Sequence, residues 1–535
     1  MNNVDYLYNP EAAKPLLARN FFVDKKLGFQ VIENGTILPY KKTINGMRTR
    51  DGWGYGGIVD STGEYIRTSH VESGIGSSYP PPPDKIQKSS ETVIYLGMFH
   101  STWGHCITDN IRRLWFLKSE YFKEFKDCPL VYLICTKMKE FTLETYENFR
   151  RLLEILEVDV ESLRLVTEPT VFEKIILPDE SFSLGRTFTN EYRETINQIR
   201  DFALKNKTTL PVKKVYYFHG ARHIGEEHLA EYFHSKGYEV VSPEKLTLDE
   251  QLNLLINCEN FAATIGSTSH NSVFLREGTE ATFIPRLPGS IGSYQASLNQ
   301  VNSIKANYVD STLGLFGNWY VHNLYIISPL LKNFFGDKRA DYEEEDFKIF
   351  LSYVKDSMEK NRLLDPRTDE YYGKILPDFM AQLKQREDLI TVADMPPHWE
   401  DFRQKLIYQT HIHKKSWVTW GVENSINGYP DEKFDIQAIK INYPNHKVYY
   451  SVYYDDKEGW SEEVTNSEVA GTTGKGKAIY GVRIRLDEAS SKEFNILYRV
   501  HKFDDTWTAW VKNGECIYSY GQKLNAIQIK LEAKP

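Results

Sequence analysis

The sequence lacks the features that mark membrane, secreted, metal-binding and nucleic-acid-binding proteins. No run approaches the roughly 20 apolar residues of a membrane span, and no basic segment followed by an apolar one opens the chain as a signal peptide would. The net charge is -8, which does not suggest a nucleic-acid partner. The five cysteines are scattered without metal-ligand spacing, so a reducing cytoplasm fits best. They are Cys106, Cys128, Cys135, Cys258 and Cys516.

No acidic triplet of the kind that holds a divalent metal dominates the sequence. The pairs Asp455-Asp456 and Asp504-Asp505 fall in hairpin-like loops, where aspartates are common turn residues. We therefore expect neither a metal site nor a resident cofactor.

Residues 215–265 alternate short apolar runs with helical segments. Strands are expected at 215–218, 239–241 and 261–265, with helices between them. Thr247 and Glu250 have the spacing of a capping box at the start of the second helix. This alternation predicts a doubly wound, parallel sheet, in which ligands bind beyond the carboxyl ends of the strands.

The turn Gly266–Asn271 is the most informative stretch at that edge, because it follows an apolar run and opens a short helix. Backbone N–H groups left unpaired there, with a helix dipole behind them, suit a phosphate. Arg222 follows the first strand and falls at the same edge, so both elements are expected to bind one anion. An ordinary strand-to-helix turn with a capping serine is the alternative. The side-chain donors of the turn are Ser267, Thr268, Ser269 and His270.

A second chemical cluster lies at residues 100–117, whose second half is expected to be helical. His105, Asp109, Arg112 and Arg113 recur at spacings that share one helix face. Asp109 is the first choice for a general base and His105 the second, since a carboxylate four residues from an imidazole can orient it or share its proton work. A surface salt bridge from Asp109 to Arg112 or Arg113 is the alternative.

This cluster resembles the Gly-His-x3-Asp signature of glycosyltransferase family 61, the capsular polysaccharide biosynthesis proteins. The matching residues are Gly104-His105, Asp109 and Arg113-Leu114-Trp115. The resemblance covers roughly residues 90–290 and includes a second signature. Its parts are Val215 to Arg222, Pro243-Glu244 with Thr247 and Gln251, Gly266 to Asn271, and Gly278-Thr279.

The resemblance implies an inverting, metal-independent, hexosyltransferase-like enzyme of GT-B architecture that uses a nucleotide sugar, commonly a UDP-sugar. Many members have Ser-Arg where this chain has Phe218-His219, and Gly-Ala at Ser267-Thr268, so the phosphate contacts differ in detail. His100, Trp103 and Arg113 are expected at the acceptor or cleft, with Asp109 and His105 as the catalytic pair. The expected nucleotide-sugar residues are Arg222, His219, Glu244, Leu246, Gly266, Ser267, Thr268, Ser269, His270 and Asn271.

The last third contains three copies of one pattern, at 407–442, 448–486 and 496–531. Each copy opens with an aromatic-rich strand, continues to a tryptophan, and closes with alternating apolar residues. Three such repeats predict a closed, three-fold β domain, either a trefoil or a prism. The tryptophans are Trp417, Trp460 and Trp507, and they either close the core or bind a glycan.

The repeats resemble the clostridial hydrophobic-Trp (ChW) repeats, most clearly at Gly459-Trp460 and the following 469–475. The resemblance implies a Gram-positive, Firmicute-like source. A non-catalytic glycan- or cell-wall-binding protein that works through these repeats is the alternative function.

The expected fold is a GT-B-like, two-lobed α/β region followed by an all-β domain of three repeats. We expect an acceptor-side lobe at 1–205, a nucleotide-sugar lobe at 206–300, a helical segment at 301–400 and the β domain at 401–535. The function expected is sugar transfer in bacterial capsule or cell-surface polysaccharide synthesis, in the cytoplasm. Its partners are a nucleotide sugar and a glycan or glycoconjugate acceptor; peripheral membrane association, homo-oligomerisation and the identities of sugar and linkage stay open.

Overall fold

The structure is a computed structural model that divides into two compact units. It describes residues 2–42, 44, 54–67, 75–134, 146–220, 223–313, 324–337, 341–359, 375–386, 406–418, 421–443, 446–455, 457–519 and 521–534. The first unit comprises Met1–Gly314, Trp319–Asp346 and Lys374–Phe379. The second comprises Leu315–Asn318, Phe347–Gly373 and Met380–Pro535. The expected helical segment 301–400, which includes α9 (Glu344–Glu359) and α11 (Ile375–Lys384), is therefore shared between the units.

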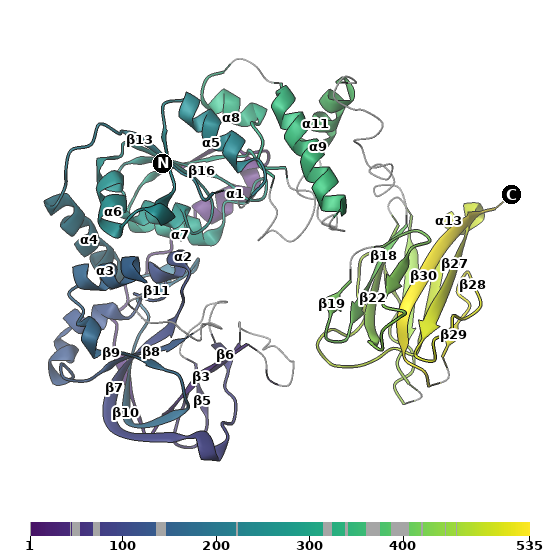
Figure 1. The fold of residues 1–535 in the computed structure, drawn as a ribbon, viewed down its shortest axis with the longest axis horizontal. Helices are drawn as coiled ribbons and strands as arrows, with labels where there is room; N and C mark the ends of the chain where they lie inside the picture. Colours follow the sequence, from purple (N-terminus) through teal and green to yellow (C-terminus); the bar gives the residue numbers. More distant parts are fainter. Residues whose placement is uncertain are drawn as a thin grey trace. The chain divides into compact units, whose positions relative to one another are not determined.

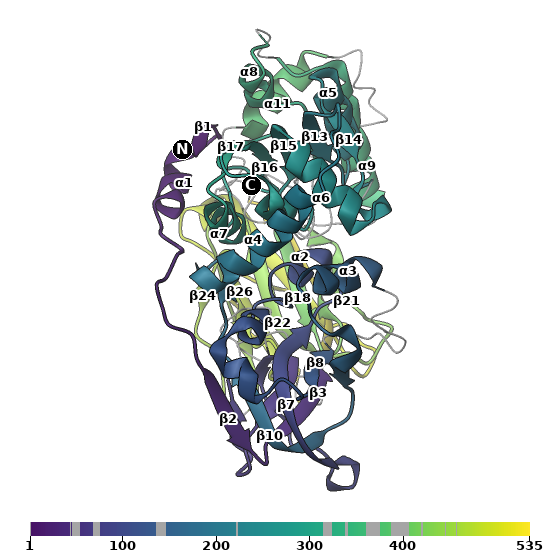
Figure 2. The ribbon, with the colours of Figure 1, turned by 90° about the vertical axis from the view of Figure 1, so that its left-hand side faces the viewer.

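A six-stranded sheet in the order β1-β17-β16-β15-β13-β14 forms one part of the first unit. All of its neighbouring strands are parallel, as the sequence predicted, and Figure 2 shows them side by side in that order. The strands are β1 (Asn3–Tyr6), β13 (Lys214–Tyr217), β14 (Glu239–Val241), β15 (Asn260–Thr264), β16 (Glu280–Ile284) and β17 (Lys305–Val309). The accompanying helices are α1 (Pro10–Leu17), α4 (Asn190–Lys205), α5 (Glu226–Ser235), α6 (Leu248–Asn257), α7 (Ser293–Val301) and α8 (Pro329–Phe334).

The N-terminal strand β1 lies in this sheet, where Asn3 is opposite Asn307 on β17. In Figure 1 the purple start of the chain accordingly lies among teal elements. The buried Asp310 carboxylate secures this crossing, since it accepts hydrogen bonds from the backbone N–H groups of Tyr8 at 2.9 Å and Gly289 at 3.0 Å. The predicted lobe at 1–205 thus contributes its first strand, β1, to the six-stranded sheet, whose other strands lie between residues 214 and 309.

A nine-stranded, mixed sheet forms the other part of the first unit, with the order β5-β4-β3-β10-β7-β8-β9, β2 beside β10 and β6 beside β4. Its β10-β7-β8-β9 portion is parallel. The strands are β2 (Phe29–Glu33), β3 (Thr36–Lys41), β4 (Gly54–Val59), β5 (Tyr65–Ile66), β6 (Ile75–Ser77), β7 (Gln87–Phe99), β8 (Leu130–Ile134), β9 (Leu163–Val166) and β10 (Thr170–Pro178). Helices α2 (Trp103–Cys106) and α3 (Glu147–Ile155), and the hairpin of β11 (Phe182–Ser183) and β12 (Thr187–Phe188), complete it.

One hydrophobic core joins the two sheets of the first unit. It includes Leu96 and Tyr132 from the nine-stranded sheet together with Tyr217 and Phe261 from the six-stranded sheet. The two sheets therefore belong to one continuous body, which fixes α2, at the end of β7, relative to the turn after β15. Among the described residues, no helix is both long and apolar enough to cross a membrane.

The second unit contains three antiparallel sheets, one for each predicted copy. The long strands of a copy pair with each other, as β18 with β22, β23 with β26, and β27 with β30. Each sheet also receives a short strand from the next copy, as β25 joins β22, β29 joins β26, and β21 joins β30. The strands are β18 (Ile407–Ile412), β19 (Ser416–Trp417), β20 (Gly421–Val422), β21 (Ile426–Gly428), β22 (Ile436–Asn442), β23 (Val448–Tyr453), β24 (Val464–Thr465), β25 (Ala470–Gly471), β26 (Gly481–Leu486), β27 (Phe494–Lys502), β28 (Val511–Lys512), β29 (Ile517–Tyr518) and β30 (Leu524–Ala533), with helix α13 (Ser490–Glu493).

Equivalent tyrosines connect the copies. The Tyr408 hydroxyl accepts a hydrogen bond from the Ile529 N–H at 3.0 Å, and the Tyr498 hydroxyl accepts one from Ile484 at 3.1 Å. Tyr450 makes the corresponding backbone hydrogen bond with Ile441. Each bond links one copy to the closing strand of the preceding one.

The three repeated tryptophans lie outside the buried core of this unit. That core consists of aliphatic residues and tyrosines, whereas Trp417, Trp460 and Trp507 are half-buried. Each tryptophan lies beneath a cation, with Lys440 over Trp417 at 4.7 Å, Arg483 over Trp460 at 5.6 Å and Arg499 over Trp507 at 4.6 Å. The alternative in which these tryptophans close the core is therefore wrong.

Candidate active site

The segment after β7 is a short helix followed by turns, so the expected helix through residue 117 is wrong. Helix α2 ends at Cys106, and 3₁₀ geometry resumes only at Leu114–Lys118. Side chains satisfy the local backbone instead, since the Thr108 hydroxyl donates to the Gly104 carbonyl at 2.8 Å and Asn110 bonds both the N–H and the carbonyl of His100. The Asp109 N–H still donates to the His105 carbonyl at 2.8 Å. That single turn preserves the i, i+4 contact between the two side chains.

Half-buried His105 and buried Asp109 form a hydrogen-bonded pair. Their Nδ1 and Oδ2 atoms are 2.7 Å apart, and the Asp109 carboxylate also accepts from Arg112 at 3.0 Å and Thr108 at 3.0 Å. The Asp109 side chain is 2% exposed and that of His105 is 19% exposed. Burial raises the pKa of Asp109. The hydrogen bond from His105 and the charge of Arg112 lower this pKa by more than burial raises it, so it lies below its usual range. The expected alternative of a surface salt bridge does not describe this carboxylate.

His100 and Arg113, two of the residues expected at the acceptor side, pack beside this pair and its segment. The His100 ring stacks on His105 at 4.6 Å between centroids, and burial lowers the pKa of His100 to about 3, which keeps it neutral. Arg113 is buried and donates to the Pro178 carbonyl at 2.9 Å and to Glu180 at 3.2 Å. Both residues therefore brace the segment that carries the pair.

Helix α2, which carries His105, contacts the turn after β15 directly. The Trp103 indole N–H donates to Asn271 Oδ1 at 2.9 Å. A Cβ atom at Gly104 would lie 2.9 Å from His270 Nδ1 and 3.2 Å from Ser267 Cα. Glycine at position 104 is thus required by close packing, and the packing brings the two predicted clusters together.

Five of the six residues of the turn divide into two groups. Ser267, Thr268 and Asn271 line a cavity. Ser269 is fully buried, accepts from the Gly266 N–H at 2.9 Å and donates to Gln295 at 2.6 Å. His270 is also buried, and burial lowers its pKa to about 3. The second group holds the turn in shape, while the first faces the cavity.

The cavity has a volume of about 530 Å³ and lies between elements of both sheets. Three further residues predicted for the nucleotide sugar line it, namely His219, Glu244 and Leu246, as does Trp103. Arg222 lies outside the described residues. The lining residues that the sequence did not single out for this role are Tyr146, Glu147, Asn148, Pro243, Lys245, Thr247 and Gln251.

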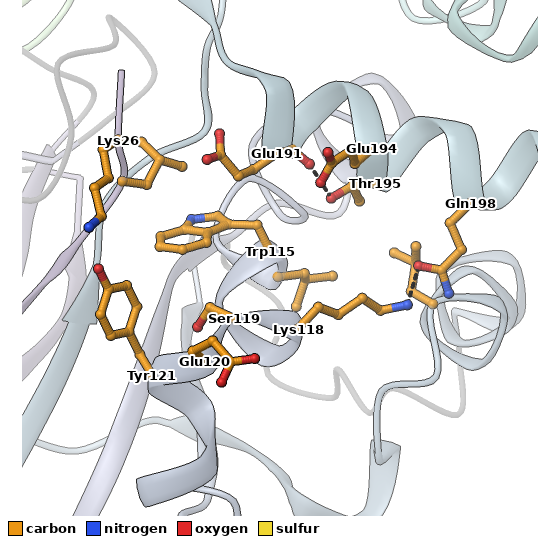
Figure 3. Close-up of a pocket in the computed structure, with 13 residues that line it drawn as sticks. Lys26, Trp115, Lys118, Ser119, Glu120, Tyr121, Glu191, Glu194, Thr195 and Gln198 are labelled. Carbon is orange, nitrogen blue, oxygen red and sulfur yellow. Dashed lines mark hydrogen bonds between the residues drawn. The ribbon is translucent and has the colours of Figure 1, made fainter. Parts of the chain in front are cut away.

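A second cavity of about 530 Å³ lies in the same unit, and no predicted site residue lines it. Trp115, Tyr121 and the side chains of Glu191, Glu194 and Thr195 surround the space in Figure 3. Trp115 is the last residue of the matching signature, and its indole N–H donates to the Asp179 carbonyl at 2.9 Å. Within the described ranges, no group of three or more His, Cys, Asp and Glu residues is placed to hold a metal ion.

Comparison with protein families agrees with both resemblances. Residues 103–282 match the family model of glycosyltransferase 61, and residues 457–488 match that of the clostridial hydrophobic W repeat. No curated protein matches the chain. The first match spans the His105–Asp109 pair, the cavity lining on the six-stranded sheet and the turn after β15, and it supports glycosyltransferase activity for this region.

Proposed function

We propose that this chain transfers a sugar from a nucleotide donor, a UDP-sugar, to a hydroxyl group of a glycan or glycoconjugate, with inversion. The observation that carries the proposal is the packing of Gly104 and Trp103 against the turn after β15. It places the helix that carries His105 against an anion-directed turn, inside the region matched by glycosyltransferase 61. Trp103 of that helix and Ser267, Thr268 and Asn271 of the turn line one cavity, whereas His105 and Asp109 are not among its lining residues.

In this proposal His105 is the general base and Asp109 positions it. His105 Nδ1–H donates to Asp109, so Nε2 takes the proton from the acceptor hydroxyl. The acceptor oxygen then bonds to the anomeric carbon as the bond from that carbon to the donor phosphate breaks. The nucleoside diphosphate leaves with the bonding electrons, and Asp109 stabilises the imidazolium ion. The assignment follows exposure, because Asp109 is almost fully enclosed by His105, Thr108 and Arg112.

The donor is assigned to the cavity beside the turn. The Glu244 carboxylate can accept hydrogen bonds from ribose hydroxyls, while Lys245 and the hydroxyls of Ser267 and Thr268 can bind phosphate oxygens. Arg222 keeps its sequence-based assignment to the diphosphate. These donors would stabilise the leaving charge without a metal ion.

We further propose a GT-B arrangement for the two α/β sheets and a β-prism for the C-terminal unit. The half-buried tryptophans outside the core favour glycan binding by that unit. A non-catalytic protein acting through these repeats is the second candidate function. We also propose that the transfer serves capsule or cell-surface polysaccharide synthesis in a bacterial cytoplasm.

Calorimetric titration with UDP, followed by measurement of UDP release from UDP-glucose, UDP-galactose and UDP-N-acetylglucosamine, tests the proposal. We expect saturable UDP binding, and an Arg222→Ala variant should lose a charge-assisted contact of about 1.5–3 kcal/mol. Unchanged UDP affinity in that variant would remove Arg222 from the site. Absence of UDP binding by the wild type would favour the non-catalytic candidate.

A further inference from the structure

Arg286 is a cation at the same sheet edge that the preceding assignments leave unused. It lies two residues beyond the end of β16, the strand next to β15. A Cβ atom at Gly266 would clash with the terminal nitrogen Nη2 of Arg286 and would lie 3.0 Å from its Cζ. The guanidinium group therefore lies directly against the first residue of the turn.

This contact explains why position 266 is glycine. Gly266 is absent from the glycines with positive φ, so its backbone does not require glycine. The requirement is spatial, since any side chain at this position would occupy the place of the Arg286 guanidinium. The position of the Arg286 guanidinium thus depends on the absence of a side chain at Gly266.

Arg286 forms no ion pair among the described residues, although its charge acts on the buried Glu226. Its Nε atom is buried without a hydrogen-bond acceptor, and no ion pair of the described chain includes this guanidinium. Arg112 and Arg113, by contrast, are both paired with carboxylates. A buried, unpaired donor costs free energy, which an anionic ligand would recover.

Backbone donors lie beside this cation. In the described part of the chain, the N–H groups of Ser267 and Thr268 have no acceptor, and both residues line the cavity. A guanidinium next to backbone N–H groups and two hydroxyls matches the oxygen-rich, doubly charged surface of a diphosphate.

From this geometry we infer that Arg286 binds the diphosphate of the donor. Gly266, which has no side chain, leaves the space that the Arg286 guanidinium occupies. The inference rests on the proposed function and adds a phosphate-binding residue to it. Neutralisation of Glu226 is the competing role. Burial raises the pKa of Glu226 to about 7 although the charge of Arg286 lowers it, and the two side chains do not form an ion pair.

Calorimetry with UDP and with uridine on four variants tests the inference. Arg286→Met should weaken UDP binding about 10- to 100-fold and leave uridine binding unchanged, because only UDP carries the diphosphate. Gly266→Ala should give a similar loss by displacing the guanidinium, and in the Arg286→Met background it should add little. Arg276→Met is the matched control, since Arg276 donates to the Cys258 carbonyl at 3.3 Å, away from the cavity.

Wild-type UDP affinity in a folded Arg286→Met variant would overturn the inference and leave the proposed function standing. A lowered melting temperature with unchanged UDP affinity would assign Arg286 to Glu226 instead. If the losses of UDP affinity in Arg286→Met and Gly266→Ala were fully additive in the double variant, the two residues would not act together, and the inference would also be contradicted. Failure of the wild type to bind UDP would overturn both the inference and the proposed function.

Discussion

Replacing Asp109 by asparagine tests the roles assigned to the histidine–carboxylate pair. The substitution keeps the shape but removes the charge that faces His105 at 2.7 Å and Arg112 at 3.0 Å. Breaking a buried ion pair from one side costs about 3–5 kcal/mol. Arg112 retains Glu180 at 3.2 Å, so we expect a loss of about 2–3 kcal/mol in the free energy of unfolding. Turnover should fall about 10²–10⁴-fold, because His105 loses its orientation and the stabilisation of its imidazolium form.

The stability difference should depend on pH. Folding lowers the pKa of Asp109, so its ion pairs stabilise the protein fully above pH ~4 and the contribution is lost as the pH falls toward the lowered value. The difference in the free energy of unfolding between wild type and Asp109→Asn should therefore be largest near neutral pH and should become smaller below pH ~4. Denaturant unfolding across this range measures it.

The matched control is Asp249→Asn. Asp249 pairs with Arg151 at 2.8 Å on the surface, and its loss should cost under about 1 kcal/mol with normal turnover. Normal turnover and stability in Asp109→Asn would refute the reasoning. A large loss in Asp109→Asn with near-normal turnover in His105→Ala would return the role of base to Asp109.

Three other outcomes are expected. Gly104→Ala should lower both the melting temperature and UDP affinity, since its Cβ would lie 3.2 Å from Ser267 Cα; unchanged affinity would disconnect the helix from the turn. Transfer should survive EDTA, and strict dependence of UDP release on manganese would contradict the metal-free proposal. Tyr450→Phe should destabilise the C-terminal unit by about 1–3 kcal/mol in denaturant unfolding, because it removes the hydroxyl that donates to the Glu468 carbonyl; an unchanged midpoint would show that this link is dispensable.

Local signals in the sequence predicted much of the six-stranded sheet. The capping box is confirmed, as Thr247 and Glu250 exchange hydrogen bonds at the start of α6. The strand ending at the Gly266 turn is also confirmed. Both features depend on residues within a few positions of one another, which is why a single sequence reveals them.

Contacts between distant residues, and side-chain contacts that compete with a helix, could not be predicted from the sequence. Periodicity at 105–117 favoured a helix, but Thr108 and Asn110 bond the neighbouring backbone and end it early. The four residues of β1 carry no information about their partner β17. Arg286 follows strand β16 at the carboxyl edge of the sheet, yet only its packing on Gly266 identifies it.

A crystal structure with UDP bound would test the central claim most directly. The account predicts the diphosphate against Ser267, Thr268 and Arg286, the ribose beside Glu244, and the phosphate that would carry the sugar directed toward His105. UDP bound in another part of the first unit, or an empty cavity at saturating UDP, would contradict it.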